Sequence, residues 1–252
     1  MEVHHHPDFE RKRFREYFFE FVMIFLAVAM GFFAESMRQH IEDGRKEREI
    51  VASLRQDLVK DTARLEKLIT VYEPQYHDWV DSAHFCVDSL PLRGNERRIC
   101  KALFNATVWA TYTPPEIALA QLKSSGGLDL VSNAKVRLGI LDYNIAINNF
   151  NKYTEFITIV EHSVDTSLTR LIPRQATRKF LEEISGVDGF LGDHDVPQQI
   201  IFKTYLKADF ENFLNKLDQI DFKIHDLADS YKTILGQDIK LLKSLDEVYK
   251  ID

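Results

Sequence analysis

The sequence predicts an all-α protein: one N-terminal transmembrane helix that continues as a long rod into an antiparallel helical bundle. Three observations predict this fold. A nearly uninterrupted apolar segment lies close to the N-terminus, apolar residues after it recur at spacings of three and four, and strand-like alternation is almost absent from the 252 residues. We expect a basic cytoplasmic tail, a transmembrane helix, a juxtamembrane rod and an extracytoplasmic bundle, at residues 1–16, 17–36, 37–72 and 73–252.

The composition restricts the classes of protein that need to be considered. Only 10 Gly and 7 Pro occur, which argues against a disordered or linker-rich chain. The net charge is −7, and no basic patch dominates, which argues against nucleic acid as a partner. The mean hydropathy is −0.24, so the apolar segment is an exception in a chain that otherwise suits water. Residues 73–252 are enough for one compact core.

The apolar segment reads YFFEFVMIFLAVAMGFFAES, residues 17–36. Its first 18 residues carry one charge and would span roughly 27 Å as a helix, close to the hydrocarbon thickness of a bilayer. A buried core helix would keep a polar stripe, and a cleaved signal peptide would be followed by small residues at a cleavage site. Here ESMRQHIEDGRKERE follows instead. These features favour an uncleaved anchor, and because no second such segment occurs, a single-pass protein in contact with the lipid bilayer.

The orientation follows from the flanking basic residues. RKRFR, residues 11–15, precedes the segment, and four Lys or Arg residues follow it at Arg38, Arg45, Lys46 and Arg48. The two sides nearly balance, but the cluster before the segment is tighter and the tail is short. We therefore expect the N-terminus in the cytoplasm and the main domain outside it.

One face of the predicted membrane helix has small side chains in its middle and carboxylates at its ends. The residues on this face are Glu20, Ile24, Ala27, Gly31, Ala34 and Glu35. Ala27 and Gly31 form a small-xxx-small step, which allows a second helix to approach closely. The face therefore predicts an oligomer seam between copies of the chain, although such steps are also frequent by chance.

Glu20 lies about three residues inside the segment, and two interpretations remain open. It can be a carboxylate at headgroup depth, close to Arg13 and Arg15. Alternatively, it can act as a proton or ion site, or as a polar contact between protomers, because ionisable groups inside membranes are rare and usually functional.

The rod is predicted from a repeat of apolar residues at helical spacing, namely Val51, Leu54, Leu58, Leu65, Leu68 and Tyr72. Asp61 interrupts this repeat. The helix is predicted to break at Glu73–Pro74, because a residue before proline is disfavoured in the helical region.

The bundle is predicted from helical patterns separated by turn residues. Pro114–Pro115 starts a short helix, Gly126–Gly127 ends it, and Asn133 caps the next helix. SGVDGFLGDHDVP, residues 185–197, reads as a loop. The expected helices are 75–90, 95–109, 133–172, 176–184 and 200–249, the last with a break near Gly236.

Cys86 and Cys100 flank a loop between two predicted helices, and two readings remain. A disulfide bridge would close a loop of about 15 residues and contribute roughly 3 kcal/mol, in an oxidising compartment such as a periplasm. Alternatively, both are buried free thiols, which are common in helical cores.

The opening MEVHHHPDFERKRFREYFFEFVMIFLAVAMGFFAES resembles the start of a Bacteroidota family of membrane-anchored proteins, whose members typically begin MEVHHHP. The segment LKSSGGLDLVSN, residues 122–133, is similar to a second signature of that family. The resemblance implies an inner-membrane protein with a helical extracytoplasmic domain and a native histidine cluster. No activity is assigned to the family, so the resemblance implies no catalytic residue.

His4, His5 and His6 are the predicted metal candidate, with zinc as the metal. An extended tail or several gathered tails would be needed, and the alternative is a tail lying on anionic headgroups. His77 and His84 are seven apart, whereas ligand pairs prefer three or four, so we interpret them as surface or core histidines. GDHD, residues 192–195, is interpreted as ordinary polar residues of a loop and not as a ligand site.

Motifs of hydrolases, P-loop proteins, dinucleotide-binding enzymes, HExxH metalloproteases and kinases are absent from the sequence. We therefore predict a non-enzymatic structural or assembly protein, which forms a homo-oligomer or accompanies another membrane protein. Two alternatives remain. The first is a proton- or ion-coupled membrane subunit that uses Glu20, and the second is an extracytoplasmic ligand-sensing bundle.

Overall fold

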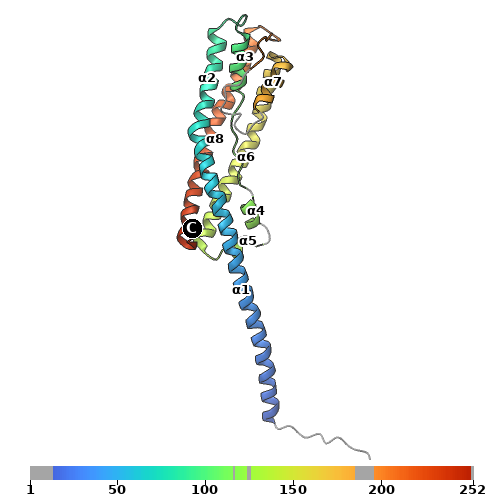
Figure 1. Ribbon diagram of the computed structural model, residues 1–252, viewed down its shortest axis with the longest axis vertical. Helices are drawn as coiled ribbons and strands as arrows, with labels where there is room; N and C mark the ends of the chain where they lie inside the picture. Colours follow the sequence, from blue (N-terminus) through green and yellow to red (C-terminus); the bar gives the residue numbers. More distant parts are fainter. Residues whose placement is uncertain (1–13, 116, 124–125, 185–195, 251–252) are drawn as a thin grey trace, which may run out of the picture. The chain divides into compact units, whose positions relative to one another are not determined.

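The computed structural model describes residues 14–115, 117–123, 126–184 and 196–250 (Figure 1). These residues form helices and connecting loops without a β-strand, so the all-α prediction is confirmed. The chain divides into two compact units, Met1–Glu49 and Ile50–Asp252, which we call the N-terminal and C-terminal units. Helix α1, Phe14–Lys67, contributes residues to both.

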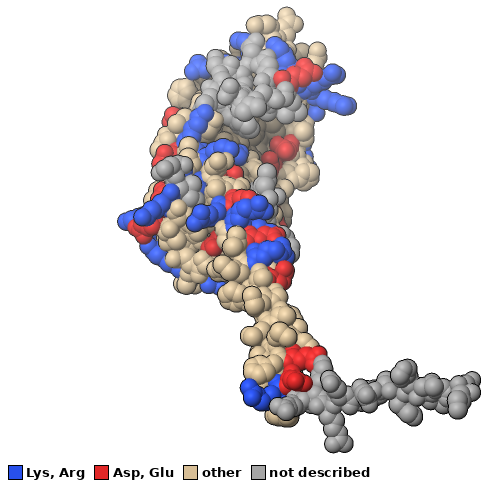
Figure 2. Space-filling view, turned by 60° about the horizontal axis from the view of Figure 1, so that its bottom comes forward, with Lys and Arg blue, Asp and Glu red and all other residues tan. Residues whose placement is uncertain are grey.

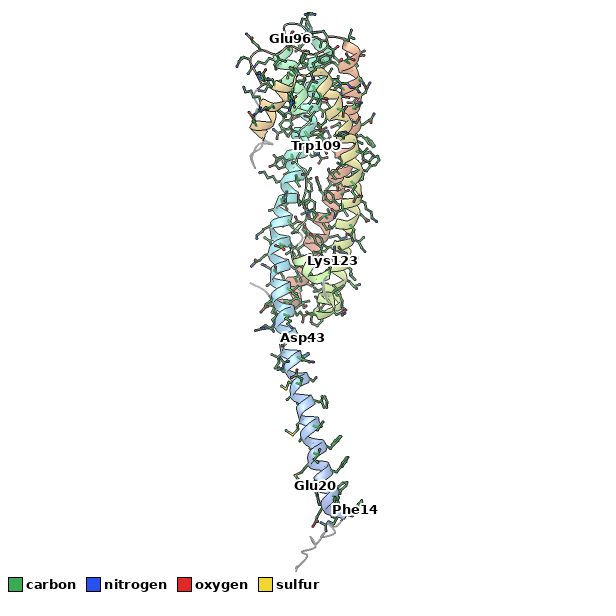
Figure 3. All side chains as sticks on the ribbon, turned by 90° about the vertical axis from the view of Figure 1, so that its right-hand side faces the viewer. Phe14, Glu20, Asp43, Glu96, Trp109 and Lys123 are labelled. Atoms are coloured by element: carbon green, nitrogen blue, oxygen red, sulfur yellow. The ribbon has the colours of Figure 1, made fainter. Side chains whose placement is uncertain are left out.

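Within the N-terminal unit, α1 is a single regular helix whose side chains are not buried by the protein. None of residues 14–49 is buried, and the side chains between Glu20 and Asp43 project from the helix on all sides (Figure 3). An apolar window in this helix has a mean hydropathy of 2.1 and no buried part. The described residues thus contain one helix that is long and apolar enough to cross a membrane.

Within the C-terminal unit, α1 leads through the π-helical turn η1, Leu68–Tyr72, into α2, Glu73–Ser89. The predicted break at Pro74 is not present. Proline lacks an N–H and its ring clashes with the carbonyl four residues earlier. A wider turn, in which the Glu73 N–H donates to the Leu68 carbonyl five residues back, lets the helix continue through this position.

Five further helices and one helical turn complete the bundle: α3, Glu96–Asn105; α4, Ile117–Lys123; the turn α5, Gly127–Leu130; α6, Ala134–Leu171; α7, Arg174–Ile184; and α8, Lys207–Tyr249. The side chain of Asn133 accepts a hydrogen bond from the Val136 N–H at 3.1 Å, which confirms the predicted cap of α6. Gly126 has φ +80° before α5, a conformation that favours glycine. Helix α8 continues through Gly236 without the expected break.

The core of the bundle consists of two hydrophobic clusters along the paired helices α6 and α8. The first core cluster joins α2, α3 and α7 to the end of α6 and the start of α8. The second joins α1 and α4 to the start of α6 and the end of α8. In Figure 1, α2, α3 and α7 accordingly lie toward one end of the C-terminal unit, and α4 and α5 toward the other. The two clusters meet near the start of α2.

Charged side chains cover the outside of the bundle. On the face shown in Figure 2, Lys and Arg are interspersed with Asp and Glu over the C-terminal unit, as on a water-exposed surface. Uncharged side chains, by contrast, cover a continuous stretch of α1 in the N-terminal unit.

Candidate functional site

The residues of the predicted oligomer seam all lie on one helix, and no other part of the N-terminal unit that the structure describes covers them. Its residues, Glu20, Ile24, Ala27, Gly31, Ala34 and Glu35, all belong to α1 and are all exposed. No heavy atom lies within 4 Å of the position that a Cβ of Gly31 would take. Arg38 binds Glu35 at 2.7 Å and Glu42 at 3.1 Å on the same helix. Glu35 therefore already has a cationic partner within its own chain.

The bundle contains a central polar cluster, which we define as Asp61 of α1, Tyr112, Tyr143 of α6 and Asp238 of α8. The Tyr112 hydroxyl donates to Oδ2 of Asp61, and the Tyr143 hydroxyl oxygen lies 3.4 Å from the same atom. Asp61 is 4% exposed and Asp238 is 0% exposed. The carboxylate that interrupted the apolar repeat of α1 is thus a buried contact point for three distant segments.

Arg64 holds the segment that carries Tyr112 in place. Its guanidinium donates to the carbonyl oxygens of Thr113 and Thr111, at 3.3 and 3.4 Å. Arg64 lies one helical turn after Asp61, and its charge slightly opposes the rise in the pKa of that carboxyl. Helix α1 therefore binds this loop segment through both an arginine and an aspartate.

Burial and mutual proximity disfavour ionisation of both carboxyls at once. Burial raises the pKa of Asp61 and of Asp238, and the charge of Asp61 raises the pKa of Asp238 further. Among the described residues, no N–H or O–H of another side chain donates to the oxygens of Asp238, which faces Asp61. The raised pKa of Asp238 favours its protonated form, and a proton on this carboxyl would allow it to donate to Asp61. Burial also raises the pKa of Tyr112 and Tyr143, which therefore stay protonated donors.

A row of histidines and carboxylates connects α2 to α8. His77 Nδ1 lies 2.6 Å from Asp221 Oδ1, and His84 Nε2 lies 2.6 Å from Asp218 Oδ1. His225 Nδ1 lies 3.6 Å from Glu73 Oε1. His77 and His84 are both partly exposed, and each faces a carboxylate of α8.

Sequence reasoning missed Glu73 and His225. The spacing of four between Glu73 and His77 places both on one face of a helix, and this signal was present in the sequence. Their partner His225 lies on α8, far along the chain, and no local pattern indicates that it faces α2.

A cavity of about 460 Å³ lies against the first core cluster. Its lining includes Trp109 (Figure 3), Phe104 and the carboxylate of Glu161, whose pKa is raised by burial and by the charge of Asp165. The ligand-sensing alternative would place a ligand here.

Of the two readings of the cysteines, the structure has the free thiols. Cys86 of α2 and Cys100 of α3 are free thiols, both buried in the first core cluster. Burial raises the pKa of the Cys100 thiol to about 12, so this group stays protonated and unreactive at neutral pH. The second reading, two core thiols, describes this structure.

Two predicted features lie outside the described residues. His4, His5 and His6 belong to residues 1–13, and GDHD belongs to residues 185–195. Zinc binding by the N-terminal histidines therefore stays a prediction.

The C-terminal unit thus offers a sealed pair of acids and a more accessible group of imidazoles and carboxylates, while the N-terminal unit offers an exposed apolar helix. No family model, curated protein sequence or solved structure matches the chain.

Proposed function

We propose that this chain is a membrane-anchored, non-enzymatic assembly protein of the bacterial inner membrane. Its segment 17–36 crosses the bilayer, the N-terminus is cytoplasmic, and the bundle is periplasmic. The observation that carries the proposal is the apolar window of α1, which has a mean hydropathy of 2.1 and no buried part. A core helix of a water-soluble protein passes the same hydropathy criterion but buries its apolar side chains.

The exposed apolar surface is too extensive for water. Between residues 14 and 41, the large apolar side chains that are more than half exposed are Phe14, Tyr17, Phe18, Phe19, Phe21, Met23, Ile24, Phe25, Leu26, Val28, Met30, Phe32, Phe33, Met37 and Ile41. Burying one such side chain stabilises by about 1.5–3 kcal/mol. Contiguous apolar surface of this kind mediates association with lipid or protein. Lipid covers all sides of a helix at once, which matches the distribution of these residues.

We further propose that assembly uses the face with Ala27 and Gly31. Small residues let two helix backbones come close inside a membrane, where packing rather than water exclusion drives association. The sealed acid pair of the bundle favours a structural over a catalytic role, since neither carboxyl can reach a dissolved substrate.

The experiment that tests this assembly is a measurement of native mass after detergent solubilisation, with mass spectrometry of the copurifying proteins. We expect a mass of at least two chains of 29.4 kDa. Gly31→Leu should shift the protein to the mass of one chain, because the larger side chain separates the two helices. Ala29→Leu is the matched control, because Ala29 lies on the opposite side of the helix, and it should keep the oligomer.

Three results would count against this seam. If both variants dissociate or neither does, another surface holds the copies together. If the native protein is a single chain that copurifies with a different membrane protein, assembly is with that partner. If the protein is a single chain and no partner copurifies, the assembly function is wrong.

Glu20→Gln separates this proposal from the ion-coupled alternative. An amide keeps the size and hydrogen-bonding capacity of the side chain but cannot take up a proton at neutral pH. We expect the variant to retain the native oligomeric mass and to complement a deletion strain fully. Loss of complementation at unchanged mass would favour proton or ion coupling by Glu20.

A further inference from the structure

The start of α2 and the middle of α8 bring together a second set of metal-ligand side chains. Glu73, His77 and His225 each offer one ligand atom, and these atoms all lie within 4.8 Å of one another. From this geometry we propose that Glu73, His77 and His225 bind a divalent transition metal of the zinc class. This site is independent of the proposed membrane function and of the N-terminal histidines.

The donor set suits zinc. Imidazole nitrogens and a carboxylate oxygen bind Zn²⁺ at about 2.0–2.2 Å, and the edges of such a tetrahedron are about 3.3 Å long. His225 Nδ1 and Glu73 Oε1 lie 3.6 Å apart, close to that edge. The remaining separations of up to 4.8 Å need only small side-chain rotations to close around an ion.

The contact between His77 and Asp221 orients the imidazole ring of His77 for metal binding. Its Nδ1 lies 2.6 Å from Asp221 Oδ1, and in the tautomer whose Nδ1–H donates to this carboxylate, Nε2 is left as the ligand. Metal-binding histidines almost always donate their other nitrogen to a carboxylate, a carbonyl or water. Asp221 therefore acts as a positioning residue for His77.

The wide turn of η1 contributes to the site. The additional residue of a π-helical turn changes the phase of the following helix by about 100°. Glu73 is the first residue after η1, so this turn sets the phase of the face with Glu73 and His77, which contacts His225 and Asp221 of α8. π-Helical turns are frequent at functional sites.

The accessibility of the side chains leaves one coordination position open. Glu73 is 15% exposed, His77 is 33% exposed and His225 is 64% exposed. An ion can therefore approach from the side of His225, and water supplies the fourth ligand, as in open zinc sites with three protein ligands. Because α2 and α8 both contribute, the bound ion connects the two helices where the core clusters meet.

His84 supplies an internal comparison. It lies on the same helix and has the same 2.6 Å contact to an aspartate of α8, Asp218, as His77 has to Asp221. His84 does not belong to the group of converging ligands found among the described residues. A simple hydrogen bond between α2 and α8 accounts for His84, but it does not account for the convergence of three ligands at His77.

The test is a zinc titration of the full chain in detergent, after removal of bound metal, in competition with a chromogenic zinc chelator. His4, His5 and His6 are first replaced by Ala, because they are a separate zinc candidate. This background should bind one Zn²⁺ per chain. His77→Ala and His225→Ala should each weaken binding by on the order of 100-fold, and Asp221→Asn by about 10–100-fold. His84→Ala should leave the affinity unchanged.

Thermal unfolding with and without Zn²⁺ distinguishes a loss of zinc binding from a loss of folding. Saturating Zn²⁺ should raise the melting temperature of the background chain, because the folded state binds the ion, and should not raise that of His225→Ala. His225 is well exposed, so this variant should melt at the background temperature without metal. The proposal is overturned if the background binds no Zn²⁺, or if His84→Ala weakens binding as much as His77→Ala.

Discussion

Removal of residues 1–49 is expected to transfer the protein completely from pelleted membranes to the supernatant. The deletion removes all of the exposed apolar helix of the N-terminal unit. It leaves the hydrophobic core intact, because both core clusters lie in the C-terminal unit and the first buried residue of α1 is Val51. The remaining chain should therefore be helical and unfold cooperatively, which circular dichroism measures.

The control is a shorter deletion. Removing only residues 1–13 keeps the apolar segment, and this protein should still float with lipid in a density gradient, which separates membranes from aggregates. The intact mass of the full chain isolated from cells should include residues 1–36, since a signal peptide would have been removed. Membrane anchoring by this segment is wrong if the longer deletion still floats, or if the full chain stays in the supernatant.

Local sequence patterns were sufficient for the elements that depend on neighbouring residues. The spacing of Val51, Leu54 and Leu58 predicted a helix with one buried face, and all three are buried. The cap at Asn133 and the positive φ at Gly126 follow from the chemistry of single residues. Such features need no information about distant parts of the chain.

The prediction failed where tertiary packing decides between local alternatives. A proline after Glu73 predicts a helix end, yet a π-helical turn accommodates Pro74 while Leu68 stays buried in the second core cluster. Continuing the helix keeps both α1 and α2 packed against the bundle. A helix end is the better local choice, but the packing of both helices outweighs it.

Sites assembled from distant segments were beyond the reach of the sequence for the same reason. Asp61 was visible as an interruption of an apolar repeat, which is equally typical of an exposed kink and of a buried contact. Only the fold brings Tyr112, Tyr143 and Asp238 to it. Likewise, the pair Glu73 and His77 becomes a candidate metal site only because α8 places His225 beside it.

The central polar cluster should make the stability of the bundle depend on pH, and Asp238→Asn should remove much of this dependence. Burial raises the pKa of both carboxyls above the ordinary value of 3.8, so the folded protein binds more protons than the unfolded chain from about pH 4 upward. The contribution of Asp61 and Asp238 to the free energy of unfolding is thus fully present below pH 4. It falls as the pH rises, by about 1.4 kcal/mol per pH unit for each proton, until the raised pKa is passed.

An asparagine at position 238 is neutral without a proton, and its amide can donate to Asp61 as the protonated carboxyl does. Urea unfolding of the full chain in detergent, followed by circular dichroism between pH 5 and 8, should therefore give a flatter profile for Asp238→Asn. At pH 7.5, about 3.5 units above pH 4, the variant should be more stable than the native protein by up to about 5 kcal/mol, at 1.4 kcal/mol per pH unit for one proton. Asp142→Asn, an exposed position on α6, should leave the native profile unchanged. If Asp238→Asn instead lowers stability equally at every pH, the two carboxyls do not share a proton, and the cluster is held together by the tyrosine hydroxyls alone.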